Sequence, residues 1–236
     1  MTPEIRAEVT AARSSKRPFV LATRLSDGAQ ALIFADHTDA ALHPALLAAA
    51  QDALAADHSG TVEVEGERWF LHVQNPPLRL VVVGAVHVAQ ALVPLAADLG
   101  YSVRVIDPRG AFATAERFPN VSVSTGWPDE AMAEFAPDAR SAVVTLTHDP
   151  KLDDPALDAA LKSSAFYIGA LGSRKTHAAR LARLRELGHA EATLARIRGP
   201  IGLDIGAETA PEIALSILAE IVAVRRQAAI ALKAAA

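Results

Sequence analysis

Residues 80–87 have the sequence Leu-Val-Val-Val-Gly-Ala-Val-His and decide the fold, because they lead from a buried strand through a glycine turn into a helix. A second stretch of the same kind, residues 166–174, has the sequence Phe-Tyr-Ile-Gly-Ala-Leu-Gly-Ser-Arg. Each turn would leave unpaired backbone N–H groups and the positive end of a helix dipole at one edge of a sheet. We therefore expect a phosphate-bearing ligand at that edge.

Short apolar runs alternate with helical patterns around these two stretches. The predicted strands are residues 78–83, 102–106, 121–124, 142–146 and 165–168. They are apolar on both sides, as strands covered by helices on two faces are. Helices are predicted near residues 87–99, 129–136 and 153–163, and a last one begins at the capping box of residues 209–212. The alternation predicts an α/β fold with a Rossmann-like, doubly wound parallel sheet.

The sequence Asn75-Pro76-Pro77 marks a domain boundary, because consecutive prolines stop regular structure and stiffen a linker. Before it, helical patterns alternate with two hairpins that turn at residues 26–28 and 65–67. We therefore expect a small α+β domain over residues 1–75 and the Rossmann-like domain over residues 78–236.

Composition limits the classes of function. The chain has 236 residues and is 51% hydrophobic, enough for one substantial core and a small second domain. Without an apolar run of membrane-spanning length or a signal-peptide pattern, we expect a cytoplasmic protein that does not bind membranes. The absence of cysteine excludes disulfides, thiolate metal sites and a persulfide carried on this chain. A net charge of −4, with two Trp and two Tyr, disfavours nucleic-acid binding.

The first glycine turn fits a dinucleotide-binding fingerprint only in part. The three small positions of that fingerprint fall on Gly84, Val86 and Ala89. A valine at the second position intrudes on the place of a pyrophosphate. Asp107 ends the next strand, where a carboxylate would favour a ribose 2′-hydroxyl over a 2′-phosphate. Alternatively, residues 107–109 (Asp-Pro-Arg) form no more than a charged turn.

The second glycine turn resembles a phosphate loop but lacks the spacing of a Walker sequence, so ATP hydrolysis has little support. It offers backbone donors, hydroxyl groups and two cations at one helix start, in residues Gly169, Gly172, Ser173, Arg174, Lys175 and Thr176. The positive end of the helix dipole repels cations at this position unless an anion binds beside them. Arg174 and Lys175 are therefore the cations that we expect to bind a phosphate.

Two further loops should face the same crevice. His148 and Asp149 follow the fourth strand, where His148 could donate to a ligand or act as a base with Asp149 orienting it. His-Asp-Pro is also ordinary turn chemistry. Within the glycine-rich loop of residues 199–207, Asp204 could bind a donor-rich ligand edge, such as a pterin amine, or merely cap neighbouring amides. His87 begins a helix, and the dipole should keep it neutral.

Six blocks of sequence together resemble the XdhC/CoxI family, the xanthine dehydrogenase accessory proteins. These blocks are residues 83–89, 107–109, 116–119, 147–149, 167–174 and 199–207. The resemblance covers roughly residues 78–226 and implies a maturation factor without independent catalytic activity. Such a factor binds molybdenum cofactor, takes part in its sulfuration with a cysteine desulfurase, and delivers it to an apo molybdenum hydroxylase of the xanthine dehydrogenase or CO dehydrogenase type.

The chain departs from the family pattern in two places. Family members commonly carry a Gly-Gly-Cys block in the N-terminal domain, whereas this chain has no cysteine. Val86 stands where the family usually has glycine. Two alternatives stay open beside the maturation factor: an NAD(P)-dependent oxidoreductase, against which Val86 counts, and a scaffold that binds no cofactor. The apolar last helix is consistent with a homodimer. The candidate cofactor-binding residues are Gly84, His87, Asp107, His148, Asp149, Gly169, Gly172, Ser173, Arg174, Lys175 and Asp204.

Overall fold

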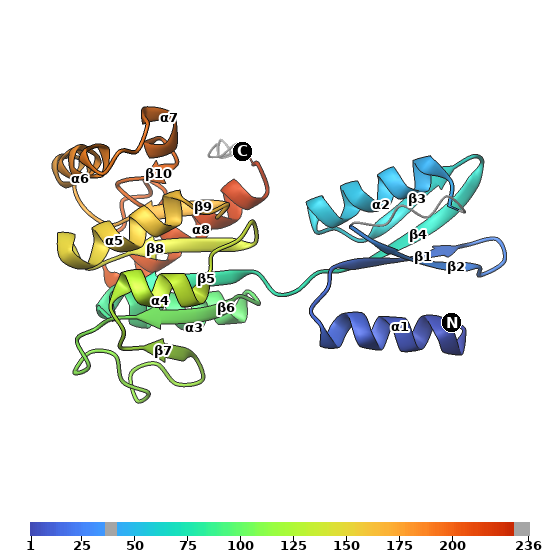
Figure 1. Cartoon of the computed structure of the whole chain (residues 1–236), viewed down its shortest axis with the longest axis horizontal. Coiled ribbons are helices and arrows are strands. Elements are labelled where there is room, and N and C mark those ends of the chain that lie inside the picture. Colours follow the sequence, from blue (N-terminus) through green and yellow to red (C-terminus); the bar gives the residue numbers. More distant parts are fainter. Residues whose placement is uncertain (36–41, 229–236) are drawn as a thin grey trace, which may run out of the picture. The chain divides into compact units, whose positions relative to one another are not determined.

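The computed structural model describes residues 1–35 and 42–228. The chain divides into two compact units, Met1–Pro76 and Pro77–Ala236. Figure 1 shows the elements of both units. None of the helices in the described ranges is long and apolar enough to cross a membrane.

The first unit is an antiparallel sheet of order β2-β1-β4-β3 with one helix on each face (Figure 1). Its elements are α1 (Pro3–Ser14), β1 (Phe19–Arg24), β2 (Gln30–Phe34), α2 (Pro44–Ala56), β3 (Gly60–Val64) and β4 (Glu67–Gln74). Neighbouring strand residues point to opposite faces. Val20 therefore packs in the cluster of Leu46 from α2, whereas Phe19 packs in that of Val9 from α1.

The second unit is a six-stranded parallel sheet of order β10-β9-β8-β5-β6-β7. Its strands are β5 (Arg79–Val83), β6 (Ser102–Ile106), β7 (Ser122–Ser124), β8 (Ser141–Thr145), β9 (Tyr167–Ala170) and β10 (Ile197–Arg198). The helices are α3 (His87–Asp98), α4 (Pro128–Phe135), α5 (Pro150–Leu161), α6 (Arg174–Glu186), α7 (Glu191–Leu194) and α8 (Ala210–Arg225). This is the strand order of a Rossmann fold, which confirms the predicted fold class.

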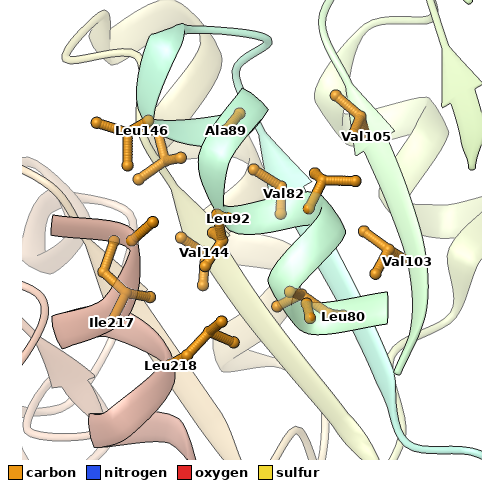
Figure 2. Packing of buried hydrophobic residues seen from close by; sticks show 14 of the residues in the cluster. Leu80, Val82, Ala89, Leu92, Val103, Val105, Val144, Leu146, Ile217 and Leu218 are labelled. Atoms are coloured by element: carbon orange, nitrogen blue, oxygen red, sulfur yellow. The ribbon is translucent and has the colours of Figure 1, made fainter. Parts of the chain in front are cut away.

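Alternate residues of the central strands supply two cores, one on each face of the sheet. Figure 2 shows part of the first core cluster, with Leu80 and Val82 of β5, Leu92 of α3 and Ile217 of α8. On the opposite face, Val81 packs in a cluster with residues of α4 and α5. The strands are therefore apolar on both sides, as the sequence indicated.

The register brings the carboxyl ends of neighbouring strands to one edge. Val83 of β5 is level with Ile106 of β6 and Thr145 of β8. From β5 the chain continues to β6 and β7, which lie on one side of β5 in the sheet. The later strands, β8, β9 and β10, lie on its other side. This reversal between β5 and β8 is the switch point, where open α/β sheets bind their ligands.

Candidate cofactor-binding site

The first glycine turn lies against the loop that follows β8. Gly84 has a φ of +109°, and a Cβ atom there would lie 2.6 Å from Cγ2 of Thr147. Both facts require glycine at this position. Val86 is the N-cap of α3 and provides no side-chain cap, and His87 at the helix start is exposed. The turn is thus shaped as the sequence predicted, but its second small position carries a valine.

The carboxylate of Asp107 is enclosed by its own chain. Its Oδ2 accepts hydrogen bonds from the Ala85 N–H (2.8 Å) and from Nη2 of Arg109 (2.8 Å). Its Oδ1 accepts from the N–H and from Nε of Arg109, both at 2.9 Å. The residue has 0% of its surface exposed. The structure therefore shows an internal brace at Asp107, in agreement with the charged turn that the sequence left open as the alternative to a ribose site.

This brace should make stability depend on pH. Burial alone raises the pKa of Asp107, but the hydrogen bonds from Arg109 and Ala85 outweigh burial and hold the pKa below its ordinary value of 3.8. Because the folded-state pKa is depressed, the stabilisation is complete above about pH 4 and is lost as the pH falls through the folded-state pKa. We expect Asp107→Asn to lower the free energy of unfolding by about 1–3 kcal/mol at pH 7.

Urea titrations of the wild type and of Asp107→Asn at pH 7 and pH 3 measure this difference. The difference in free energy of unfolding between wild type and Asp107→Asn should shrink at pH 3. Asp98→Asn, at an exposed position of α3, should change the free energy of unfolding little at either pH. A difference between wild type and Asp107→Asn that stays constant with pH would contradict the assigned brace.

Asp153 holds the loop after β8. Its carboxylate accepts hydrogen bonds from Oγ1 of Thr147 at 2.7 Å and from the N–H of His148 at 3.1 Å. His148 has a φ of +62° and an exposed side chain. Asp149 caps α5 by accepting from the Lys151 N–H at 2.9 Å. Of the two roles that the sequence left open, the structure shows the turn and not a partner that orients His148.

A buried arginine joins this loop to the second glycine turn. Nη2 of Arg180 donates to the Leu171 carbonyl at 2.9 Å and lies 3.4 Å from Oδ2 of Asp153. Arg180 and Asp153 are each 1% exposed. Burial raises the pKa of Asp153 and lowers that of Arg180. The pair fixes the two loops in relation to each other.

Sequence reasoning missed the Asp153–Arg180 pair. Arg180 and Leu184 are the buried residues of α6, and Leu187, directly after the helix, is 61% exposed. The i, i+4 spacing of Arg180 and Leu184 was the available signal.

The second glycine turn ends in a capped helix with free cations. Ser173 is the N-cap of α6 and accepts from the Thr176 N–H at 3.2 Å. Gly172 has a φ of +143°, and a Cβ there would lie 3.7 Å from Nδ1 of His148. Arg174 and Lys175 are exposed, and neither forms an ion pair with another described residue. Their charges are therefore available to an anion.

The loop of residues 199–207 is fixed on β9 and α8. Glu220 of α8 accepts from the Tyr167 hydroxyl at 2.5 Å and from the Gly202 N–H at 2.9 Å. Burial raises the pKa of the Tyr167 hydroxyl, which keeps its proton for this bond. A Cβ on Gly169 would lie 2.4 Å from Cδ1 of Ile201, so Gly169 serves close packing beneath the loop.

A cavity of about 380 Å³ opens between this loop and the second glycine turn. It is lined by Leu171, Arg174, Pro200, Ile201, Gly202, Leu203, Asp204, Ile205, Gly206, Ala207, Ile213 and Ser216. The structure thus places Arg174 and Asp204, from two separate motifs, on the wall of one cavity. The other candidate residues do not line this cavity: Gly84, His87, Asp107, His148, Asp149, Gly169, Gly172, Ser173 and Lys175. The described residues contain no cluster of side chains suited to a metal ion.

The family model for the XdhC Rossmann domain matches residues 80–221. This chain belongs to the XdhC family. The match starts in β5 and ends in α8, so it includes both glycine turns and the loop of residues 199–207. The resemblance predicted from the six sequence blocks is confirmed.

Three curated proteins are similar to this chain. The chain is 37% identical over 151 residues to the molybdenum cofactor insertion chaperone PaoD of Escherichia coli K12. This match covers 64% of this chain and 41% of PaoD. It is 35% identical over 162 residues to a probable xanthine dehydrogenase subunit of Bacillus subtilis 168, covering 68% and 47%. It is 36% identical over 177 residues to the uncharacterized E. coli protein YqeB, covering 75% and 32%. The matched region spans less than half of each of these relatives.

A solved structure shares the fold of this chain. The crystal structure described as a xanthine dehydrogenase from Bacillus halodurans superposes with a TM-score of 0.71 at 21% identity. The superposition covers 96% of this chain and 68% of that one.

Proposed function

We propose that this chain is a maturation factor that binds molybdenum cofactor and delivers it to an apo molybdenum hydroxylase. The observation that carries the proposal is the cavity that Arg174 and Asp204 share. The relative named as a molybdenum cofactor insertion chaperone, PaoD, supports the choice of cargo. The B. subtilis relative, named as part of a probable xanthine dehydrogenase, supports the choice of client.

The residues around the cavity fit the polar parts of a phosphorylated pterin. Arg174 lines the cavity at the start of α6, and Lys175 follows it, so both can neutralise a phosphate beside the helix dipole. A carboxylate accepts hydrogen bonds only, so Asp204 would take the amino and ring N–H groups of a pterin. The volume of about 380 Å³ is within the range of small-molecule sites.

The chain itself would bind and orient the cofactor rather than transform it. Because there is no cysteine, no sulfur atom can be carried on this chain as a persulfide. A cysteine desulfurase would therefore act on the bound cofactor directly or through the client enzyme.

A homodimer also stays a prediction. The surface that favours it is a groove of about 540 Å³ between α3 and α8, where the apolar side chains of Leu95, Leu99, Leu215 and Val222 are exposed.

Arg174→Ala should weaken binding of molybdopterin by about 10- to 100-fold, since hydrogen bonds to charged groups are worth about 1.5–3 kcal/mol. The thermal midpoint should not change, because Arg174 is exposed and forms no ion pair with another described residue. Anaerobic calorimetric titration of the purified full-length chain measures the affinity.

The matched control is Arg185→Ala, at the other end of the same helix and also exposed. This variant should bind molybdopterin as the wild type does. Full-strength binding by Arg174→Ala would remove the assigned phosphate site. Absence of binding by the wild type would favour the scaffold alternative.

A further inference from the structure

The Rossmann unit has the architecture of a nucleotide site at its first glycine turn. The strand order is that of dinucleotide-binding domains, Gly84 forms the sharp turn, and Asp107 ends the neighbouring strand. A nucleotide in this position would place its pyrophosphate against the start of α3 and its ribose against Asp107. The side chains at this position decide whether it is open.

Val86 stands at the second small position of the fingerprint, where the approach of a pyrophosphate requires glycine. It is the N-cap residue of α3, directly beside the helix N–H groups. Its side chain is partly buried and packs against the core cluster under α3. A packed β-branched side chain has few alternative rotamers, so Val86 cannot turn away to admit a phosphate.

Asp107 has no acceptor capacity left for a ribose. An ionised carboxylate offers about four lone-pair sites. Four donors fill them here: the N–H of Ala85, and the N–H, Nε and Nη2 of Arg109. A ribose hydroxyl would have to displace one of these donors from a carboxylate with 0% exposure.

Arg109 is held in this position from two sides. Its guanidinium makes a two-pronged contact with Asp107, at 2.9 Å and 2.8 Å, and lies 4.8 Å from the ring centre of Phe112. Asp149 and Asp153, across the switch point, further favour its charged form and contribute to its raised pKa, after the larger effect of Asp107. The guanidinium therefore lies where the polar part of a nucleotide would bind.

We propose that Val86 and Arg109 close the nucleotide position of this Rossmann unit and thereby set its ligand specificity. NAD(P) and FAD are excluded from the first glycine turn, and ligands enter through the cavity at the second. This inference does not depend on the identity of the cargo.

The test measures binding of NADH to the full-length chain by fluorescence titration. The variants are Val86→Gly, Arg109→Ala and the double variant. The wild type should show no saturable binding up to about 1 mM, and the double variant should bind at least about tenfold more tightly. Arg117→Ala with Val86→Gly is the matched control, because Arg117 also lies near the Phe112 ring, at 5.7 Å, but does not bind Asp107. This control should bind NADH no more tightly than the single variant Val86→Gly does.

If the double variant does not fold, Arg109→Met in the Val86→Gly background replaces it, since methionine keeps an apolar chain beside Phe112 and removes only the guanidinium group. Two results would overturn the inference: NADH binding by the wild type at micromolar concentrations, or a folded double variant that binds NADH no better than the wild type. Molybdopterin binding should be equal in the wild type and the double variant. The inference and the proposed function can therefore fail separately.

Discussion

Arg180→Met is expected to lower the free energy of unfolding of the Rossmann unit by about 3–5 kcal/mol, because it leaves Asp153 as an uncompensated buried charge. Arg180 and Asp153 are both 1% exposed and lie 3.4 Å apart. The substitution also removes the hydrogen bond to the Leu171 carbonyl. The loop after β8 and the second glycine turn would then lose their shared anchor.

Urea titration followed by circular dichroism measures this loss. Arg185→Met is the matched control, since Arg185 is on the same helix and pairs with Glu191, but the two side chains are 50% and 72% exposed. That variant should cost less than about 1 kcal/mol. In the double variant Arg180→Met with Asp153→Asn, part of the stability should return because no buried charge remains. Equal losses in Arg180→Met and Arg185→Met would contradict the role assigned to the buried pair.

Gly202→Ala is expected to lower the free energy of unfolding by about 2–5 kcal/mol and to distort the cavity, through left-handed strain and overpacking. Gly202 has a φ of +92°. A Cβ there would lie 2.4 Å from Oγ of Ser216 and 3.2 Å from the backbone N of Ile217. The backbone of α8 cannot move aside without disturbing the core. The loop that carries Asp204 must move instead.

Gly206→Ala separates the two causes of this effect. Gly206 has a φ of +72° in the same loop, and no atom lies within 4 Å of the added Cβ. It should show only the strain, about 1–2 kcal/mol. Thermal unfolding and molybdopterin titration of both variants measure the difference. If Gly206→Ala lost as much stability and as much binding as Gly202→Ala, close packing on α8 would not be what shapes the cavity.

The sequence was sufficient for the parts of the fold that local patterns determine. Buried strands such as residues 80–83 are apolar on both sides, and the capping box at Thr209 and Glu212 is present in the structure. The short strand β10 was not predicted, because two residues carry no periodicity. The shared edge of the sheet could be predicted because carboxyl ends of parallel strands lie together, which is why Arg174 and Asp204 were both proposed for one crevice.

Buried charges could not be predicted from the sequence. Arg180, Asp153 and Glu220 are buried, yet in the sequence they resemble the solvated charges around them. Burial of a charge depends on a partner from another element, such as Asp153 of α5 for Arg180 of α6. The role of Asp107 was left open for the same reason, since only the folded chain shows which donors surround its carboxylate.

A crystal structure of the full-length chain with molybdopterin tests the central claim most directly. The account predicts the ligand in the cavity between the second glycine turn and the loop of residues 199–207. Its phosphate should lie within hydrogen-bond distance of Arg174, and its pterin edge against Asp204. Molybdopterin bound at the first glycine turn, or anywhere that leaves Arg174 and Asp204 without contact, would contradict the account.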